Sequence, residues 1–191
     1  MQASENRATT SVGTPPELVR AAFQDLHGTR LHGFALLVTL GNRALAARLA
    51  GEAIAAGSAR TAELRHPERA AAWLRRRVTD NARRSGRPSR RGTAAEGRLA
   101  LEELGADAAA FAGLSALSVR ERAALVADSI ERLDRGDVAS IVGVDGVRLD
   151  RQVRRARQRY AAIVAEALDD EAAVSGPTAV RIRAIAARAL A

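Results

Sequence analysis

Apolar residues recur at intervals of three and four positions through most of this chain, and no segment alternates apolar and polar residues over the length of a strand. An α-helix brings side chains back to the same face about every 3.6 residues, whereas a strand does so every second residue. The pattern therefore predicts an all-α fold.

Glycine and proline divide this pattern into separate helices. Three helices are expected to end at Gly28, Gly41 and Gly57, and a fourth begins at His66-Pro67-Glu68. Capping boxes are predicted at residues 14–17, TPPE, and at residues 118–121, SVRE. Downstream of the second box we expect a helix to about residue 132, a short helix over 136–142 and a long one from 145 to about 168.

The stretch SGRPSRRG, residues 85–92, has a composition that a packed element rarely has, and it is the best candidate for a domain boundary. We expect two small helical domains joined by a flexible linker. The predicted parts are a disordered N-terminus (1–13), a helical domain (14–84), a basic and alanine-rich linker (85–113), a helix-turn-helix domain (114–170) and a tail that can form a short helix (171–191).

The charge of the chain favours a polyanionic partner. The formal net charge is +8, the isoelectric point is about 11.4, and all 30 basic residues are arginines. Such a field attracts nucleic acid first and an anionic membrane surface second. The chain has no cysteine, no run of 18 apolar residues and no signal-peptide pattern in its first thirteen residues, so we expect a cytoplasmic protein without disulfides that does not insert into a membrane.

One stretch has the pattern of a helix-turn-helix. In DVASIVGVDGVRLDRQVRRAR, residues 137–157, a short apolar face ends at Gly143, which suits a turn, and Val144 can fill the angle between two helices. Asp145 can then cap the second helix. On that helix we expect an apolar inner face and an arginine-rich outer face: Val147, Leu149, Val153 and Ala156 inward, and Arg148, Arg151, Arg154, Arg155 and Arg159 outward.

An arginine row of this kind suits DNA, since a guanidinium group can form two hydrogen bonds with one guanine. In a chain without lysine, the same row is also typical of an ordinary solvated helix face. The order and spacing of further motifs favour the DNA-reading interpretation.

Residues 137–157 resemble, without a gap, the C-terminal helix-turn-helix of bacterial sigma-70 family factors of the extracytoplasmic-function group, whose usual string is close to EIAEVLGISVGTVKSRLHRAR. The preceding LSVRER, residues 117–122, looks like the "LP..R" that opens the family's fourth conserved region. GNRALAARLAGEAI (41–54) is similar to the family's GDRALAEDLVQEAF, and PERAAAWLRRRVTDNARR (67–84) is similar to its "P.AWL..IA.N...D..R". The resemblance covers roughly residues 16–168.

This resemblance implies a transcription initiation factor whose first domain binds core RNA polymerase and melts the downstream promoter element, while the second reads the upstream element. It implies promoter DNA and core RNA polymerase as partners, an inhibitory anti-sigma-type protein as a further one, and a place at the nucleoid. The implied recognition-helix residues are Gly146, Val147, Arg148, Arg151, Arg154 and Arg155. Those of the basic fourth helix are Arg76, Arg77, Asn81, Arg83 and Arg84, and those of the polymerase-docking helix are Arg48, Leu49 and Glu52.

The docking helix departs from the family pattern. Ala47 and Arg48 stand where the family has acidic residues, Gly51 replaces its glutamine, and Glu52 alone keeps the acid. Exchanging an acid for arginine in such a contact replaces attraction by repulsion. A divergent DNA-binding regulator, or a protein-interaction module that no longer docks on polymerase, therefore remains the alternative.

Asp150, Trp73 and the three histidines are further candidate site residues. Asp150 in the recognition helix would repel phosphate unless it pairs with Arg154 or accepts from a cytosine amino group. Trp73 is expected to pack in the core rather than to stack on a base. The three histidines, His27, His32 and His66, have no metal-ligand spacing and are expected at the surface or at helix ends. With no phosphate loop or catalytic constellation either, we expect a non-enzyme without metal or cofactor.

Overall fold

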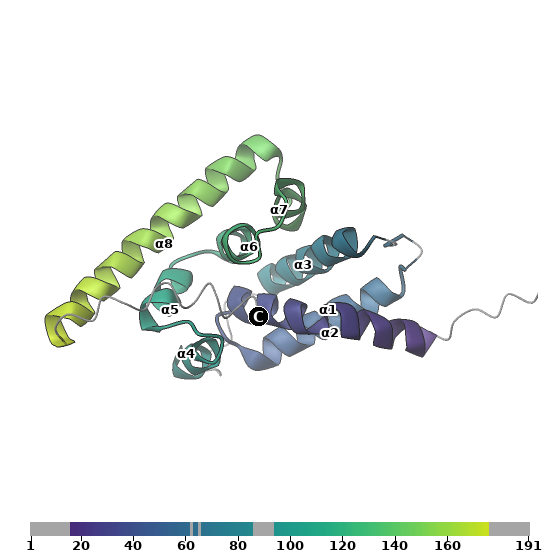
Figure 1. The fold of residues 1–191 in the computed structure, drawn as a ribbon, viewed down its shortest axis with the longest axis horizontal. Coiled ribbons are helices and arrows are strands. Elements are labelled where there is room, and N and C mark those ends of the chain that lie inside the picture. Colours follow the sequence, from purple (N-terminus) through teal and green to yellow (C-terminus); the bar gives the residue numbers. More distant parts are fainter. Residues whose placement is uncertain (1–15, 62, 65, 86–93, 176–191) are drawn as a thin grey trace, which may run out of the picture.

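The computed structural model describes residues 16–61, 63–64, 66–85 and 94–175, and every regular element in these ranges is a helix (Figure 1). The all-α prediction is thereby confirmed. The helices are α1 (Pro16–Val38), α2 (Arg43–Ser58), α3 (Pro67–Arg84), α4 (Ala94–Glu102), α5 (Ala108–Ser115), α6 (Val119–Leu125), the π-helical segment η1 (Val126–Ile130), α7 (Arg135–Val142) and α8 (Gly146–Ser175).

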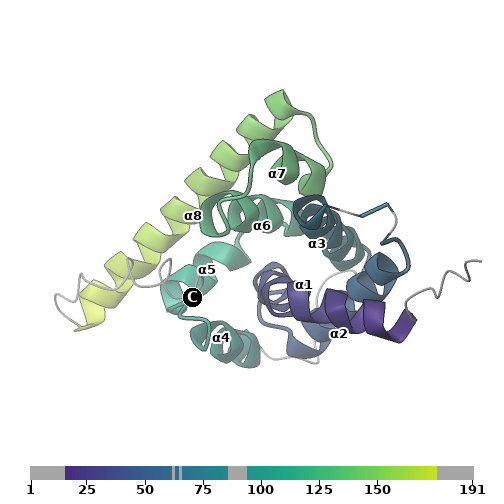
Figure 2. The same ribbon diagram turned by 45° about the vertical axis from the view of Figure 1, so that its right-hand side comes forward.

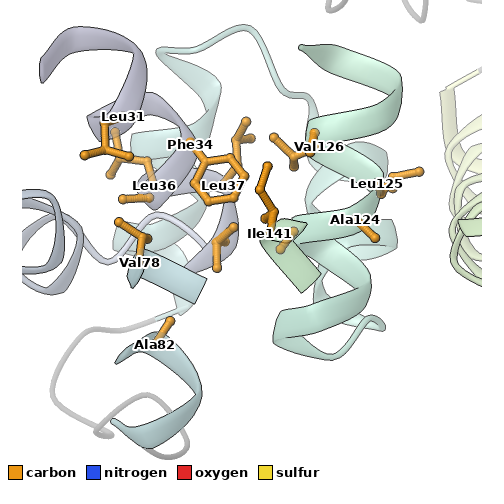
Figure 3. Packing of buried hydrophobic residues seen from close by; sticks show 14 of the residues in the cluster. Leu31, Phe34, Leu36, Leu37, Val78, Ala82, Ala124, Leu125, Val126 and Ile141 are labelled. Carbon is orange, nitrogen blue, oxygen red and sulfur yellow. The ribbon is translucent and has the colours of Figure 1, made fainter. Parts of the chain in front are cut away.

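The helices form two groups that share one core. Helices α1, α2 and α3 pack on one another, while α6, η1 and α7 lie against α1 and α3, and α8 runs along α5 and α6 at the edge of the molecule (Figures 1 and 2). Figure 3 shows Phe34 and Leu37 of α1 facing Val126 and Ile141 of the second group. The buried side chains make a single cluster, so the two-domain arrangement expected from the sequence is not confirmed.

Part of the expected linker is helical and packed. Helix α4 buries Leu101, and α5 buries Ala110 and Leu114, all of which belong to the common cluster. Residues 86–93, which include most of SGRPSRRG, lie outside the described ranges. The described portion of the linker thus takes part in the core.

The prediction that Gly28 ends a helix is wrong, because α1 continues through it to Val38. A mid-helix glycine costs about 1 kcal/mol relative to alanine, and burial of the following residues offsets this: Leu31 and Phe34 are almost fully buried. The next expected boundary is confirmed, since Gly41 adopts φ +75° after the helix. The capping box predicted at residues 14–17 falls mainly outside the described residues.

Two glycines allow the chain after α1 to touch α4. A Cβ atom on Gly41 would overlap the carbonyl oxygen of Gly97, and one on Gly97 would overlap the carbonyl oxygen of Leu40. The backbone segments approach too closely for any side chain to stand between them. This contact attaches α4 to the first group of helices.

A buried ion pair joins the two groups. The Nε and one terminal nitrogen of Arg75, on α3, each donate to the carboxylate of Glu131, just after η1, at 2.6 Å. The two side chains are only 6% and 16% exposed. The remaining terminal nitrogen of Arg75 donates to the Ala71 carbonyl oxygen, and the guanidinium lies over the ring of Phe34.

Arg122 on α6 forms the second junction. Its Nε donates to the carbonyl oxygen of Val38 at the end of α1, and a terminal nitrogen donates to the carbonyl oxygens of Leu114 and Leu117. Burial lowers the pKa of Arg122 to about 10, so it stays charged at neutral pH. One guanidinium group thereby binds the carbonyl groups at the ends of α1 and α5.

Glu131→Gln is expected to destabilise the fold by about 3 kcal/mol, because it leaves the charge of Arg75 buried without a counterion. The control is Glu103→Gln, which breaks the exposed pair with Arg43 and should cost about 1 kcal/mol or less. Urea denaturation followed by circular dichroism measures both. Equal losses in the two variants would contradict the importance of the junction.

His27 is buried in the middle of α1, so the expectation that it lies at the surface or at a helix end is wrong. Its Nε2 is buried without a hydrogen-bond partner, and its ring stands against Phe23. Burial, with a smaller contribution from the charge of Arg75, lowers the pKa of His27. His66, by contrast, is exposed directly before α3, as expected.

Because burial lowers the pKa of His27 in the folded state, the unfolded chain takes up this proton at a higher pH than the folded chain. Stability is therefore expected to fall as the pH decreases below about 6.5, until the pH has passed the lowered pKa of the folded state. Thermal melts between pH 7.5 and 5.5 test this, because His27→Leu should flatten the dependence of the melting temperature on pH. An unchanged slope in His27→Leu would refute the assignment.

Candidate nucleic-acid interface

Helices α7 and α8 are connected by the turn expected from the sequence. Gly143 ends α7 in the left-handed conformation, at φ +70° and ψ +45°, and its amide donates to the carbonyl oxygen of Ala139 at 2.9 Å. The amide of Val144 donates to the same carbonyl at 3.1 Å. The side chain of Val144 is half-buried against the core, which fixes the angle between the helices.

Asp145 caps the second helix, as predicted. Its Oδ1 accepts from the backbone amide of Arg148 at 2.9 Å, and its carbonyl oxygen accepts from the amide of Leu149. The predicted capping box at the start of α6 is also present, with Ser118 and Glu121 bonding each other's backbone amides. The local structure of the helix-turn-helix is therefore the one that the residue pattern favours.

The buried face of α8 is formed by Leu149, Val153 and Ala156, as expected. Val147 was also expected inward, which is wrong, because its side chain is 72% exposed. Residues two positions apart on a helix are rotated by about 200° about its axis, so Val147 and Leu149 cannot both face the core. Val147 lies instead on the outer face with Arg151 and Arg154.

The predicted recognition residues are all exposed on α8. Arg151, Arg154 and Arg155 make no hydrogen bond or ion pair within the described part of the chain. Arg148 stands 3.5 Å from the carboxylate of Asp145 and is 77% exposed. Gly146 begins the helix, and its carbonyl oxygen accepts from Arg135 of α7.

Asp150 pairs with Arg135 rather than with Arg154, the partner that its spacing on the helix favoured. Arg135 lies at the start of α7, so this ion pair connects the two helices of the motif. This pair offsets the negative charge of Asp150, the one acid in the first turns of α8. Arg154 is left without a carboxylate partner.

Farther along α8, two arginines hold the helix to the rest of the molecule. Arg157 contacts Asp128 of η1 at 2.5 Å, and Arg159 contacts Glu121 of α6 at 3.3 Å while also donating to the Ala116 carbonyl oxygen. These residues attach the helix through its flanks. Arg159 is exposed, as expected, although its side chain forms an ion pair.

Two hollows flank the exposed arginines of α8. The one toward α6 has a volume of about 340 Å³ and is lined by Ser118, Arg120, Glu121, Arg148, Arg151, Gln152 and Arg155. The one toward α7 and η1 is lined by Asp128, Arg135, Leu149, Asp150, Val153, Arg154, Arg157 and Gln158. The first contains four arginines and one acid, whereas the second has mixed charge.

The predicted DNA-binding residues of α3 already have partners. Arg76 and Arg83 lie 3.8 and 3.7 Å from Asp80, and Arg77 lies over the ring of Trp73. Trp73 itself is half-buried against the core, as expected, and Arg60 stacks on it as well. The sequence also favours a flexible DNA clamp that reads no sequence, made of Arg83, Arg84, Arg87, Arg90 and Arg91, of which the last three lie outside the described ranges.

Asn81 connects the basic helix α3 with the predicted docking helix α2. Its side-chain amide donates to Glu52 at 3.3 Å, and its oxygen accepts from Arg84. Glu52 also forms a 2.7 Å ion pair with Arg48 on its own helix. Leu49, the third predicted docking residue, is fully buried, so of the three only Arg48 and Glu52 are exposed.

The chain matches no protein-family model, no curated protein and no solved structure. Within the described residues, no three His, Asp or Glu side chains gather as metal ligands would. Among the described helices, none combines the length and the apolar character that crossing a membrane requires.

Gly143→Ala is expected to lower the free energy of unfolding by about 1–2 kcal/mol, since an L-residue is strained at φ +70°. A Cβ atom there would meet only the end of Arg76, so the cost comes from the backbone. Gly136→Ala, in α7 with open space around it, is the matched control and should stabilise by about 0.4–1 kcal/mol. Urea titrations of both variants measure the difference, and a neutral Gly143→Ala would argue against this turn.

Proposed function

We propose that this protein is a sigma-like transcription initiation factor, which binds core RNA polymerase and reads promoter DNA with the helix-turn-helix of α7 and α8. The observation that carries the DNA part is the exposed face of α8, where Arg151, Arg154 and Arg155 have no partner within the described structure. The turn at Gly143 and the cap at Asp145 hold this face clear of the core. Such a helix fits the major groove of duplex DNA.

The positions on α8 favour a division of roles. Val147, Arg151 and Arg154 lie opposite the buried Leu149 and Val153 and would enter the groove most deeply. Arginine in such a place can bond guanine, and an exposed valine can contact a thymine methyl group. The ion pair of Asp150 with Arg135 supports binding, because it offsets the repulsion between that acid and phosphate.

A second candidate is a DNA-binding regulator that does not dock on polymerase. The contact that favours it is on α2, where Glu52, the one acid of that helix, is already bound by Arg48 and Asn81. An acid that is neutralised within the chain has less attraction left for a basic partner. Both candidates use the same reading helix.

Arg151→Ala is expected to relax base preference at one position of the site, by about 1–3 kcal/mol of discrimination. Arg98→Ala, on α4 and paired with Glu102, is the matched control and should keep the preference. Selection from randomised duplexes, followed by titration of the selected sequences, measures both. Identical preferences in all three proteins would refute reading by this helix.

Co-elution of the full chain with core RNA polymerase at near-physiological salt separates the two candidates. The initiation factor should form a complex that Glu52→Arg abolishes. The stand-alone regulator should form none, and restoring acids with Ala47→Glu and Arg48→Glu should then create one. A folded protein that never binds polymerase in any of these forms would remove the initiation role.

A further inference from the structure

The hollow between the start of α6 and the first turns of α8 gathers positive charge in a concave place. Arg120 comes from α6, and Arg148, Arg151 and Arg155 come from α8. The two helices are far apart in the sequence and pack against each other in the fold, which brings these side chains together. A volume of about 340 Å³ lies at the small end of the range for ligand sites.

Glu121, the one acid that lines this hollow, is already bonded to other groups of the chain. One carboxylate oxygen of Glu121 accepts from the backbone amide of Ser118 at 2.9 Å, and the carboxylate also contacts Arg159, which does not line the hollow. Glu121 therefore serves the cap of α6 and the attachment of α8. Four guanidinium groups line the hollow with this one carboxylate, and of the four only Arg148 has an ion-pair partner, Asp145, which does not line it.

Arg120 has hydrogen-bonding capacity that the protein does not use. Its Nε is buried and has no acceptor, although a buried donor without a partner is costly. Arg155 has no partner within the described residues, whereas Arg148 forms an exposed ion pair with Asp145 at 3.5 Å, which a phosphate could replace at little cost. A guanidinium group is a planar fork that matches the oxygens of a phosphate.

We propose that this hollow binds a phosphate group, held by Arg120 from α6 and by Arg148 and Arg155 from the near edge of α8. Arg151 also lines the hollow, although it belongs to the outer face with Val147 and Arg154. The phosphate belongs either to the backbone of a bound duplex, in which case the inference rests on the proposed DNA binding, or to a free phosphorylated ligand. In the first case Arg120 fixes the register of α8 on DNA without contributing to sequence preference.

The test uses the full chain and two probes, inorganic pyrophosphate and a duplex of random sequence. Arg120→Gln removes the charge from α6, and Arg148→Gln, at a 77% exposed side chain, repeats the test where folding is not at stake. Arg98→Gln on α4 is the matched control. Circular dichroism checks that each variant is folded.

For a DNA phosphate, Arg120→Gln and Arg148→Gln should each weaken duplex binding about tenfold, whatever the sequence. Each should also reduce the slope of log affinity against log salt concentration by about 0.9. Arg98→Gln should change neither the affinity nor the slope. For a free ligand, pyrophosphate should bind to the parent protein, and both variants should lose about tenfold in affinity. Either result supports the phosphate site.

Failure of this inference can be told apart from failure of the proposed function. If the duplex binds with sequence preference, pyrophosphate does not bind, and both variants behave as Arg98→Gln does, the phosphate site is refuted while the reading helix stands. If no duplex binds but pyrophosphate binds in a manner that needs Arg120 and Arg148, the phosphate site stands and DNA reading does not.

Discussion

The guanidinium group of Arg122 connects segments that lie far apart in the sequence, and much of the structure depends on it. It reaches from α6 to the end of α1 and to the carbonyl groups that close α5. Burying this charge is unfavourable, as its pKa lowered to about 10 indicates, and carbonyl acceptors offset part of the cost. The ion pair of Arg75 with Glu131 repeats the arrangement between α3 and the end of η1. Both groups of helices are therefore fixed by polar contacts as well as by apolar packing.

This fixation determines where the two proposed binding surfaces lie. Helices α2 and α8 are on opposite sides of the shared core in both views (Figures 1 and 2), so a partner on α2 would not cover the outer face of α8. The family resemblance implies two promoter elements read by two domains. In the arrangement described here α3 packs against α6 and α7, and Arg76, Arg77 and Arg83 are engaged with Asp80 or Trp73. These arginines of α3 are thus engaged within the chain, whereas Arg151, Arg154 and Arg155 of α8 form no ion pair within the described residues.

Local signals in the sequence were sufficient for the helix-turn-helix. Gly143, Asp145 and the Ser118 capping box act through bonds to residues within four positions, so their roles can be predicted without knowing the fold. Long-range contacts could not be predicted in this way. Arg75 and Glu131 are separated by 56 positions, and nothing in the spacing of either residue indicates the other. Gly28 was misread because packing of the residues after it overrides its low helix propensity.

The role of each arginine in the candidate site could not be predicted from the sequence either. In a chain whose basic residues are all arginine, composition cannot tell a binding residue from a solvated one, because both have the same side chain. The partners distinguish them: Arg157 and Arg159 hold α8 in place through ion pairs, whereas Arg151, Arg154 and Arg155 form none within the described residues. An exposed ion pair is worth about 1 kcal/mol or less, so a paired arginine can still exchange its carboxylate for a phosphate. The unpaired arginines differ in that no carboxylate of the described residues forms an ion pair with them, so a polyanion would not have to displace one.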